Sequence, residues 1–384
     1  MSIAGSLVVL AFAAATEPAA TDQLYLALAG ASNITAYDID AANNGLLRRS
    51  VTPLPGRPGA LALSPDGSFL YAAVTDLRRG GSGVSTLKRA KDGSLSLIAT
   101  IATLGHATHL RTDPTGRYLL LAYYHRGGVA VHRIEDGVVG RPVYRSRTER
   151  SAHAIGIDQS GRFVFVPHPE SNRIYQFALD PHTGRLVPGE PPFVEGPDEA
   201  RMRGPRAYAR HPILDMAYTA NESAGGISAW KLDPNRGSLE LVQTSSTLPQ
   251  GFVGKSAAAH IGVTPDGRFA YVSNRDLRMP GAGKPPRDSI AGFALDPATG
   301  SMQPIGFFPT ARIPRSFCFG ARGRLLFVAG FESGELFVHE IDPTTGRLHH
   351  VATHRTQKNA TTVICVDRPA SRPPEASEEH PQAS

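Results

Sequence analysis

The sequence predicts an all-β protein that folds as a seven-bladed β-propeller, with one domain spanning residues 21–367. Two kinds of short hairpin alternate along the chain at a nearly constant spacing, and no segment after the N-terminus has the 3.6-residue apolar period of a helix. The composition agrees, because 39 glycines and 31 prolines among 384 residues supply many turns. Hydrophobic residues make up 41% and charged residues 19%, which allows a large core and excludes a disordered chain.

The two ends of the chain differ from the rest. Residues 3–15, IAGSLVVLAFAAA, have the length of the hydrophobic segment of a secretory signal, and Ala13–Ala15 suit cleavage. No Lys or Arg precedes this run, so two interpretations stay open. Either residues 1–20 are a cleaved signal peptide and the protein is periplasmic or secreted, or they are not and it is cytoplasmic. Residues 368–384 are rich in Pro, Ser and Glu and predict a disordered tail.

The first kind of hairpin is a strand, a turn with glycine and a second apolar strand. In the turn, Pro presets one backbone dihedral, Asp bonds its own backbone and Gly takes a positive φ. Six copies occur, at residues 61–74, 110–123, 155–168, 208–221, 261–274 and 318–330. The copy at 208–221 lacks the glycine but keeps an aromatic residue and the alternation of apolar positions.

The second kind of hairpin lies between these copies and has an Asp-rich turn that ends in glycine. Seven copies occur, at residues 34–47, 84–97, 129–140, 174–187, 227–241, 290–303 and 336–349. Their glycines are Gly45, Gly93, Gly137, Gly184, Gly237, Gly300 and Gly346. Two hairpins per period of about fifty residues make four strands, which is the content of a propeller blade.

The mismatch between six copies and seven copies predicts how the ring closes. The first repeat begins at residues 24–30 without an innermost strand, whereas residues 361–366, TTVICV, form a strand without a partner at the other end. We expect the last strand to join the first blade, because this pairing removes an exposed sheet edge. A β-sandwich array is the alternative, but a fixed period without linkers disfavours it.

The two cysteines, Cys318 and Cys365, each lie in an apolar strand and lack the CxxC spacing of a zinc or redox site. We interpret them as small buried hydrophobic residues, although the sequence leaves a disulfide between them open. The 40 Lys and Arg exceed the 34 Asp and Glu by six without a run of five basic residues. This diffuse charge predicts no nucleic-acid partner. No run after the N-terminus is long enough for a membrane span, and we expect a monomer.

Basic side chains recur where the inner strands of the propeller begin. Seven or eight residues before each turn glycine, or before Leu214 in the copy that lacks it, five of six copies place a histidine or an arginine. These residues are His109, His153, Arg206, His260 and Arg315. A single such histidine is usually structural, but five around one axis predict an anion-binding site.

Polar side chains also follow the second strands of two copies. Asn221 and Glu222 end one strand, and Asn274 and Arg275 end the other. One interpretation places them in the same site. The alternative makes each Asn a turn former and each charged residue a surface group.

The stretches GPRAYARHPILDMAYTANE, HIGVTPDGRFAYVSNR and PRSFCFGARGRLLFVAG resemble the seven-bladed lactonase family. That family includes the propeller-type 6-phosphogluconolactonases and the 3-carboxy-cis,cis-muconate lactonizing enzymes. The resemblance covers residues 22–367 and implies that His153, Arg206, Glu222 and Arg275 form the catalytic cluster. His109, His260, Arg315, Asn221 and Asn274 are then expected to bind substrate. His211 also matches the family pattern, but we expect it on the turn side.

The chain departs from the family pattern at two positions. Ala207 stands where the family has a histidine after PR, and Gly262 stands where a histidine precedes PDG. His260 lies two residues earlier, on the same face of the strand. An export signal would also fit poorly with a phosphorylated sugar substrate, so the lactonase scaffold is better supported than the specific phosphogluconolactone activity.

The resemblance implies a lactone hydrolase that acts on an anionic sugar-acid lactone. His153 or Glu222 would activate water, and the arginines would bind the anion and offset the charge on oxygen. A glutamate beside arginines is a weaker base and is better suited to orienting water. No GxGxxG, P-loop, GxSxG elbow or closely spaced metal-ligand set occurs, so we expect no cofactor and no metal.

Two other functions stay open. The same site could serve a muconate-type lactonizing cycloisomerase, in which a proton moves to or from carbon, or the propeller could be a non-catalytic platform for a ligand or a protein. The fold alone does not separate these functions. We also expect the loop at residues 277–289, LRMPGAGKPPRDS, to overhang the channel mouth and to limit substrate size.

Overall fold

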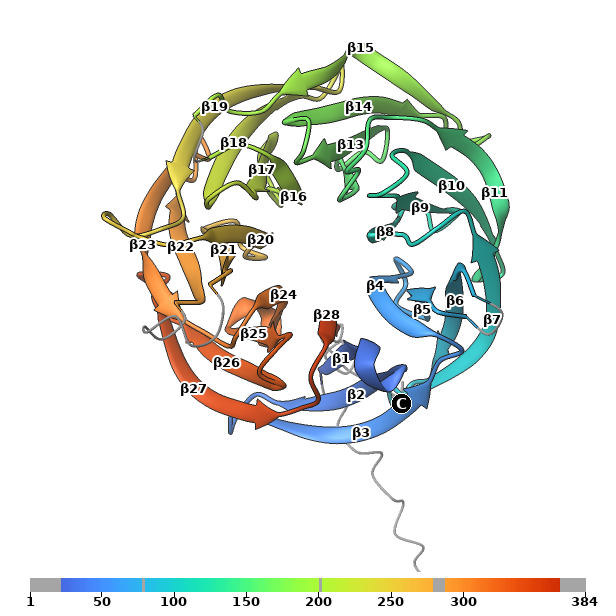
Figure 1. Cartoon of the computed structure of the whole chain (residues 1–384), viewed down its shortest axis with the longest axis horizontal. Helices are drawn as coiled ribbons and strands as arrows, with labels where there is room; N and C mark the ends of the chain where they lie inside the picture. The colour runs from blue at the N-terminus through green and yellow to red at the C-terminus, as the bar shows by residue number, and fades with distance from the viewer. Residues whose placement is uncertain (1–21, 78–79, 200–201, 279–286, 367–384) are drawn as a thin grey trace, which may run out of the picture.

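The alternating strands and glycine turns form seven four-stranded antiparallel sheets that stand radially around a central axis (Figure 1). The computed structural model describes residues 22–77, 80–199, 202–278 and 287–366. The prediction of an all-β, seven-bladed propeller is confirmed. The proposed signal peptide at 1–20 and the proposed tail at 368–384 lie outside the described residues. Among the described residues, no helix is long and apolar enough to cross a membrane.

Each blade is numbered here by its order in the ring, and its strands are given from the axis outward. Blade 1 contains β28 (Ala360–Val366), β1 (Gln23–Leu28), β2 (Asn33–Asp40) and β3 (Gly45–Pro53). Blade 2 contains β4 (Arg57–Leu63), β5 (Phe69–Thr75), β6 (Ser82–Arg89) and β7 (Leu95–Thr103). Blade 3 contains β8 (His109–Thr112), β9 (Tyr118–Ala122), β10 (Val129–Glu135) and β11 (Val138–Ser146).

The remaining blades follow the same order. Blade 4 contains β12 (Gly156–Ile157), β13 (Phe163–His168), β14 (Arg173–Leu179) and β15 (Leu186–Glu195). Blade 5 contains β16 (Pro205–Arg210), β17 (Met216–Asn221), β18 (Gly226–Asp233) and β19 (Ser238–Ser246). Blade 6 contains β20 (Ser256–Val263), β21 (Phe269–Asp276), β22 (Ser289–Leu295) and β23 (Met302–Pro309). Blade 7 contains β24 (Pro314–Gly320), β25 (Leu325–Gly330), β26 (Glu335–Ile341) and β27 (Leu348–Arg355), and two short 3-10 turns lie at Ala29–Ala31 and Ala321–Gly323.

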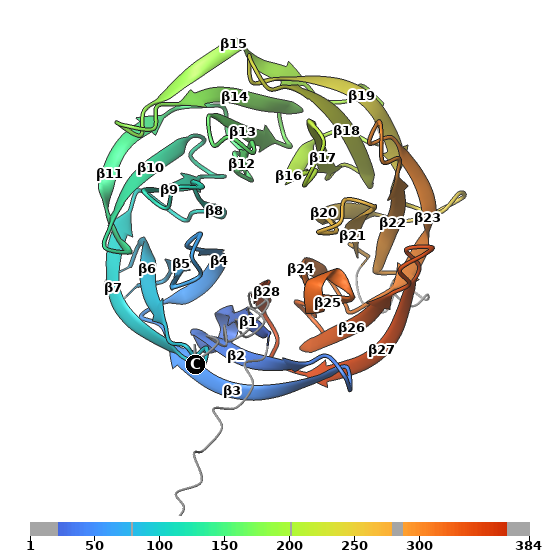
Figure 2. The same cartoon turned by 180° about the vertical axis from the view of Figure 1, so that it is seen from behind.

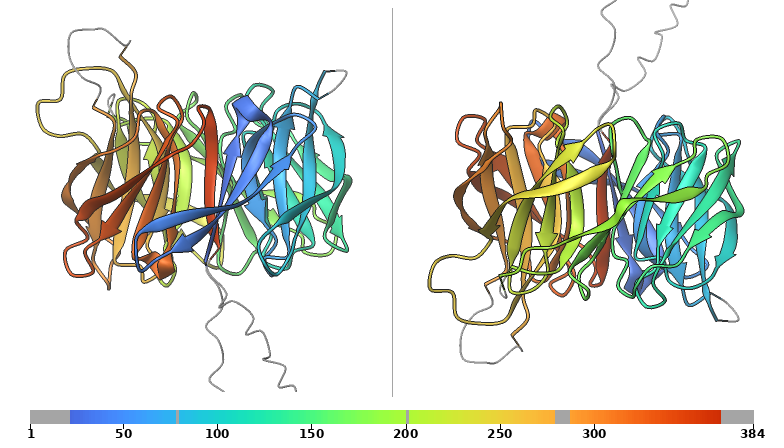
Figure 3. Two further views of the ribbon diagram at one scale, coloured as in Figure 1. Left: turned by 90° about the horizontal axis from the view of Figure 1, so that it is seen from below. Right: turned by 90° about the horizontal axis from the view of Figure 1, so that it is seen from above.

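Burial falls from the second strand of each blade to the rim. Every residue of β1, β13, β17 and β25 is buried, whereas the outermost strand β7 is mostly exposed along its length. The blades lean against one another as a closed disc (Figures 2 and 3). The core is therefore divided into apolar clusters between neighbouring sheets, such as the cluster of Tyr218, Phe293 and Val272 between blades 5 and 6.

The two repeating hairpins are joined physically by tyrosines. In five blades a buried tyrosine of the second strand donates its hydroxyl to a carbonyl in the Asp-rich turn of the next blade. The pairs are Tyr25 with Gly93, Tyr71 with Gly137, Tyr118 with His182, Tyr218 with Gly300 and Tyr271 with Gly346, at 2.7–3.0 Å. Each bond gives a buried phenol a hydrogen-bond acceptor. The Asp-rich turn of one hairpin thus docks on the aromatic residue of the other.

The glycine of the Asp-rich turn is needed for this close approach. Gly237 has φ of 68°, and a Cβ at this position would collide with the ring of Phe163 in the preceding blade. Glycine meets both demands, because it has no side chain and adopts positive φ without strain.

The C-terminal strand closes the ring as the sequence predicts. β28 pairs antiparallel with β1, with Leu24 opposite Cys365 and Leu26 opposite Val363. The backbone N–H of Val363 also donates to the Ser316 hydroxyl of blade 7 at 3.2 Å, and the Thr361 hydroxyl lies 3.1 Å from the Gly59 carbonyl of blade 2. The closing strand is therefore bonded to its own blade and to both neighbours.

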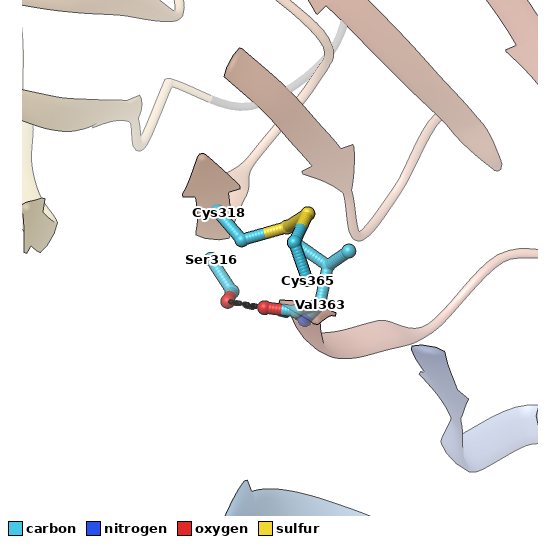
Figure 4. The surroundings of a disulfide bond; sticks show 4 residues. All are labelled: Ser316, Cys318, Val363 and Cys365. Carbon is cyan, nitrogen blue, oxygen red and sulfur yellow. Dashed lines mark hydrogen bonds between the residues drawn. A yellow bond between two sulfur atoms is a disulfide. The ribbon is translucent and has the colours of Figure 1, made fainter. Parts of the chain in front are cut away.

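A disulfide joins Cys318 of β24 to Cys365 of β28 (Figure 4). The interpretation of the two cysteines as separate buried hydrophobic residues was wrong. The repeat brings the innermost strands of blades 7 and 1 side by side, so the two Cα atoms lie 5.8 Å apart, which is within the range of a disulfide. The closure is thus covalent as well as hydrogen-bonded.

We predict that replacing both cysteines by serine destabilises the ring. The disulfide spans 47 residues, and its loss should lower the free energy of unfolding by about 2–4 kcal/mol, because the unfolded chain regains the entropy of an open loop. Urea unfolding of the wild type and of the double variant, each with and without reductant, measures this. Reductant should lower the urea midpoint of the wild type only. Equal urea midpoints for the wild type and the variant without reductant would show that the disulfide adds no stability.

Candidate active site

One end of the central channel collects side chains from several blades. The inner strands all begin at this end, which we call the strand-start mouth, and the second strands end there because each pairs antiparallel with its inner strand. Arg206 is near the start of β16, Arg275 is near the end of β21, and Glu222 directly follows β17. Residues far apart in the sequence therefore meet at one place.

The centre of the site is a carboxylate held between two guanidinium groups. Glu222 Oε1 lies 2.6 Å from a terminal nitrogen of Arg275 and 3.2 Å from Nε of Arg206. Arg275 also donates to the Ala258 carbonyl at 3.2 Å. The side chains of Arg206 and Arg275 are 6% and 9% exposed, whereas that of Glu222 is 28% exposed. The carboxylate is thus more accessible to solvent than the two cations that it bridges.

Arg206 is only partly satisfied by these contacts. Its Nη1 donates to the Ala259 carbonyl, but its Nε finds no aligned hydrogen-bond acceptor among the described residues, although the Glu222 oxygen is close. Burial lowers the pKa of Arg206 to about 9, with Arg275 adding to the decrease and Glu222 opposing it. Arg206 is therefore a cation at neutral pH whose buried Nε–H lies behind the Glu222 carboxylate.

His153 lies on the loop just before β12, with its ring edge-on to Tyr124 at 5.8 Å between centroids. No side-chain hydrogen bond joins it to any described residue. Burial lowers the pKa of His153 well below its usual value, and Arg206 and His109 lower it further. The imidazole is therefore neutral at physiological pH, and both ring nitrogens are available to a ligand or to water.

The other two channel histidines are also neutral. His109 Nδ1 accepts a hydrogen bond from the backbone N–H of Ile155 at 3.2 Å, so it supports the loop that carries His153. Burial lowers the pKa of His109 to about 3, and burial lowers that of His260 to about 4. The ring of His260 packs edge-on against Phe317 at 4.7 Å.

Arg315 is the third guanidinium at this mouth. It lies over the ring of Phe331 at 5.5 Å and forms no hydrogen bond or ion pair with the described residues. Burial lowers the pKa of Arg315, and the positive charge of Arg275 lowers it further, while its side chain still reaches solvent. An unpaired cation beside another cation favours binding of an anion.

Asn221 and Asn274 are placed differently from our expectation that they bind substrate. Both are fully buried. Asn221 accepts from the Thr219 hydroxyl at 2.9 Å and donates to the Ser228 hydroxyl at 2.8 Å, and Asn274 exchanges two bonds of 2.7 Å with Thr247. Their amides hold the strand ends from inside the blades, so we assign them as positioning residues.

His211 lies at the other end of its strand, as the sequence predicts. It is 3% exposed, and its ring is bonded to the Gly267 carbonyl and to the backbone N–H groups of Ile213 and Leu214. The expectation that the loop at 277–289 overhangs the mouth falls largely outside the described residues, because residues 279–286 are not among them.

Sequence reasoning missed two aromatic residues at this mouth, Tyr124 and Phe331. Tyr124 donates its hydroxyl to Glu170 at 2.9 Å and contacts His153 edge-on, and burial raises its pKa to about 12. A signal existed. Arg275 stands eight residues after its turn glycine, and the same offset in other copies gives Tyr124 and Phe331.

The arrangement combines a neutral base with donors for a developing negative charge. His153 can accept a proton, and Arg206, Arg275 and Arg315 can face an anionic group or an oxyanion. Among the residues that the structure describes, no group of three or more His, Cys, Asp or Glu side chains is placed to hold a metal ion.

Comparison with known proteins identifies relatives along nearly the whole chain. The family model described as "Lactonase, 7-bladed beta-propeller" matches residues 19–365. The 6-phosphogluconolactonase of Serratia proteamaculans (strain 568) is 32% identical over 305 residues, which are 79% of this chain and 87% of that protein. The 6-phosphogluconolactonase of Klebsiella pneumoniae (strain 342) is 30% identical over 327 residues, which are 85% of this chain and 93% of that protein.

Solved structures share the fold at lower identity. The periplasmic gluconolactonase of Pseudomonas aeruginosa superposes with a TM-score of 0.79 at 24% identity, covering 90% of this chain and 99% of that one. A protein from Lactobacillus plantarum gives a TM-score of 0.78 at 19% identity, covering 90% and 99%. These likenesses concern the architecture.

We predict that Glu222→Gln destabilises the protein, because it leaves Arg206 and Arg275 facing each other without a counter-charge. The free energy of unfolding should fall by about 1–3 kcal/mol, less than for a fully buried pair because Glu222 is partly exposed. Urea unfolding measures this. The matched control is Glu340→Gln, which breaks a 2.7 Å pair with Arg324 at the surface and should cost less than about 1 kcal/mol. Equal losses in the two variants would contradict the assignment of Glu222 as a bridge between buried cations.

Proposed function

The chain belongs to the seven-bladed β-propeller lactonase family, and on that premise we propose that it hydrolyses an anionic sugar-acid lactone at the strand-start mouth. The observation that carries this proposal is the neutral His153 beside the Arg206–Glu222–Arg275 cluster. A lactone hydrolase needs a base for water and cations for the oxyanion, and both are present here.

We assign the base to His153 and not to Glu222. The carboxylate oxygen of Glu222 is already shared by two guanidinium groups, which draw its electron density and fix its orientation. The ring nitrogens of His153 carry no protein hydrogen bond among the described residues. A water bound to this ring can lose a proton to it while its oxygen attacks the carbonyl carbon of the lactone.

The arginines then act on the oxygen that becomes negative. Attack turns the carbonyl into a tetrahedral intermediate, and the positive charge of Arg206 stabilises its oxyanion. When the ring C–O bond breaks, protonated His153 returns its proton to the leaving oxygen, and the product is an open-chain hydroxy acid. Glu222 keeps the two guanidinium groups in place throughout.

Arg315 is assigned to an anionic group elsewhere on the substrate. Its guanidinium has no protein partner among the described residues and is stacked on Phe331, which limits its orientations. A carboxylate and a phosphate both suit it. The curated relatives carry the name 6-phosphogluconolactonase, and the structural relative from Pseudomonas aeruginosa carries the name periplasmic gluconolactonase.

The disulfide bears on the compartment. Structural disulfides persist in oxidising environments and are rare in the reducing cytosol. The Cys318–Cys365 bond therefore supports the interpretation of residues 1–20 as an export signal.

We predict that His153→Gln and Arg206→Gln each lower kcat for lactone hydrolysis by about 10²–10⁴-fold, because one removes the base and the other a positive charge that stabilises the oxyanion. Acid release from gluconolactone, its 6-phosphate and a glucaric acid lactone is followed at constant pH. The control is His349→Gln on the exposed face of β27, which should leave kcat unchanged.

The same assay separates the alternative functions. Conversion of muconolactone with no hydrolysis of any lactone would indicate the cycloisomerase. A protein that turns over none of these compounds would indicate a binding propeller. Full activity of His153→Gln would contradict the assigned base.

The low pKa of His153 predicts an unusual pH profile. A base with a lowered pKa stays neutral as the pH falls below 6.5, and activity is lost only as the pH falls through the lowered value. We expect kcat/KM, corrected for spontaneous hydrolysis, to stay level as the pH falls from 8 through 6.5, the usual pKa of a histidine. The acid limb should disappear in His153→Gln. A decrease of kcat/KM centred between pH 6.5 and 7 in the wild type would contradict a lowered pKa for His153.

A further inference from the structure

A second cavity lies at the opposite end of the channel, where the inner strands end, and the proposed lactonase mechanism does not use it. It has a volume of about 450 Å³ and is lined by the end of β4, by all of β8 including His109, by the end of β12 and by Arg210 of β16. These four inner strands are neighbours around the axis (Figure 2). We call this place the strand-end mouth.

Arg111 is an unpaired cation in this cavity. Its side chain reaches solvent, yet it forms no hydrogen bond and no ion pair with any described residue. The protein around it lowers the pKa of Arg111 by burial, and nearby Arg210 lowers it further, although Tyr208 opposes this. Even so, an arginine keeps its charge at neutral pH. The cation therefore has no ion-pair partner among the described residues.

Arg210 adds a second positive charge, held in place by neutral groups. Its Nη1 donates to the His211 carbonyl at 2.9 Å and contacts the Gln159 side-chain oxygen at 3.2 Å. None of the carboxylates in the described structure forms an ion pair with it. Its position is thus set while its charge remains available to a ligand.

The two carboxylates that line the cavity are occupied elsewhere. Asp113 accepts from the backbone N–H groups of Tyr118 at 2.7 Å and Thr115 at 3.1 Å, within its own turn. Asp158 does the same with Phe163 at 2.8 Å and Ser160 at 3.0 Å. Both also accept a hydroxyl from the same turns. They stabilise their own turns and form no ion pair with either arginine, so the lining presents two guanidinium groups beside two carboxylates.

A buried hydroxyl without a partner lies beside the same arginines. Tyr208 is 8% exposed, and its hydroxyl finds no hydrogen-bond partner among the described residues. Its ring is fixed by stacking on Phe165 at 5.6 Å. Burial raises the pKa of this hydroxyl; the charge of Arg111 opposes the increase, Asp158 adds to it, and Arg210 opposes it less strongly. This hydroxyl is closed off from solvent and does not line the cavity, so the two arginines are the groups that could meet a ligand.

We infer that the strand-end mouth is a second binding site, which takes a small oxyanion carried on a polyol. The two guanidinium groups suit a carboxylate or a phosphate. The cavity is large enough for a six-carbon acid, since small-molecule sites span about 300–1,000 Å³. This inference concerns the end of the channel away from His153 and does not depend on the lactonase proposal.

Isothermal titration calorimetry of the full chain tests this site at constant ionic strength. The probes are sodium gluconate, inorganic phosphate and, as a neutral polyol, glucose. A variant with both Arg206→Gln and Arg315→Gln has lost two of the three guanidinium groups of the strand-start mouth, so in this background we expect one remaining class of anion site. Adding Arg111→Gln should weaken that site by about 10- to 100-fold. The comparison of gluconate with phosphate tells whether the ligand is a sugar acid or the free ion, and either supports the site.

The control is Arg117→Gln, which removes an exposed arginine from the turn after β8 whose only side-chain bond is to Thr115. It should not change the isotherm. Arg210→Gln is the second test variant, and circular dichroism checks that each variant is folded. Three results would each overturn the inference. Arg206→Gln and Arg315→Gln alone could abolish all binding, Arg111→Gln and Arg210→Gln could both leave binding unchanged, or glucose could bind as tightly as the anions. If the wild type hydrolyses none of the lactones, the proposed function is overturned, but the inference about this second site is not affected.

Discussion

The pairing of β28 with β1 is the constraint on which the rest of the structure depends. Without it, blade 1 would lack an inner strand, and the sheets would form an open arc with exposed edges. The disulfide between Cys318 and Cys365 and the Ser316–Val363 bond fix the same junction. Closure defines one axis, so strand ends from different blades face one another. The functional geometry is therefore a consequence of how the chain's two ends meet.

At the strand-start mouth, the closed ring brings more positive than negative charge together. Glu222 shares its carboxylate between Arg206 and Arg275, while Arg315 has no protein partner in the described structure. The same cations, together with burial, keep His153 neutral. One electrostatic environment therefore attracts an anion and maintains the base in its proton-accepting form. The relatives' shared fold provides the frame, but these side chains determine the chemistry.

The fold was predictable because its signals are local and repeated. Turn glycines and alternating apolar residues indicate strands wherever they occur, and their period gives the number of blades. The family resemblance implied the cluster of Arg206, Glu222 and Arg275, whereas the strand positions alone left open that Glu222 and Arg275 were surface groups. Side-chain partners were not predictable. The alternation gives the face on which Asn221 and Asn274 lie, but not that Thr219 and Thr247 bind their amides. Tyr124 was missed because the ends of the second strands were searched for polar and charged residue types. Its position, eight residues after the turn glycine, is the same as that of Arg275.

The central claim is that the lactone carbonyl binds between His153 and Arg206. A crystal structure of His153→Gln with gluconolactone bound tests this most directly, because the variant slows hydrolysis and leaves the arginines intact. The account predicts the carbonyl oxygen within about 3 Å of an Arg206 nitrogen and the ring of the sugar facing residue 153. A lactone found with its carbonyl away from Arg206, or bound only at the strand-end mouth, would contradict the account.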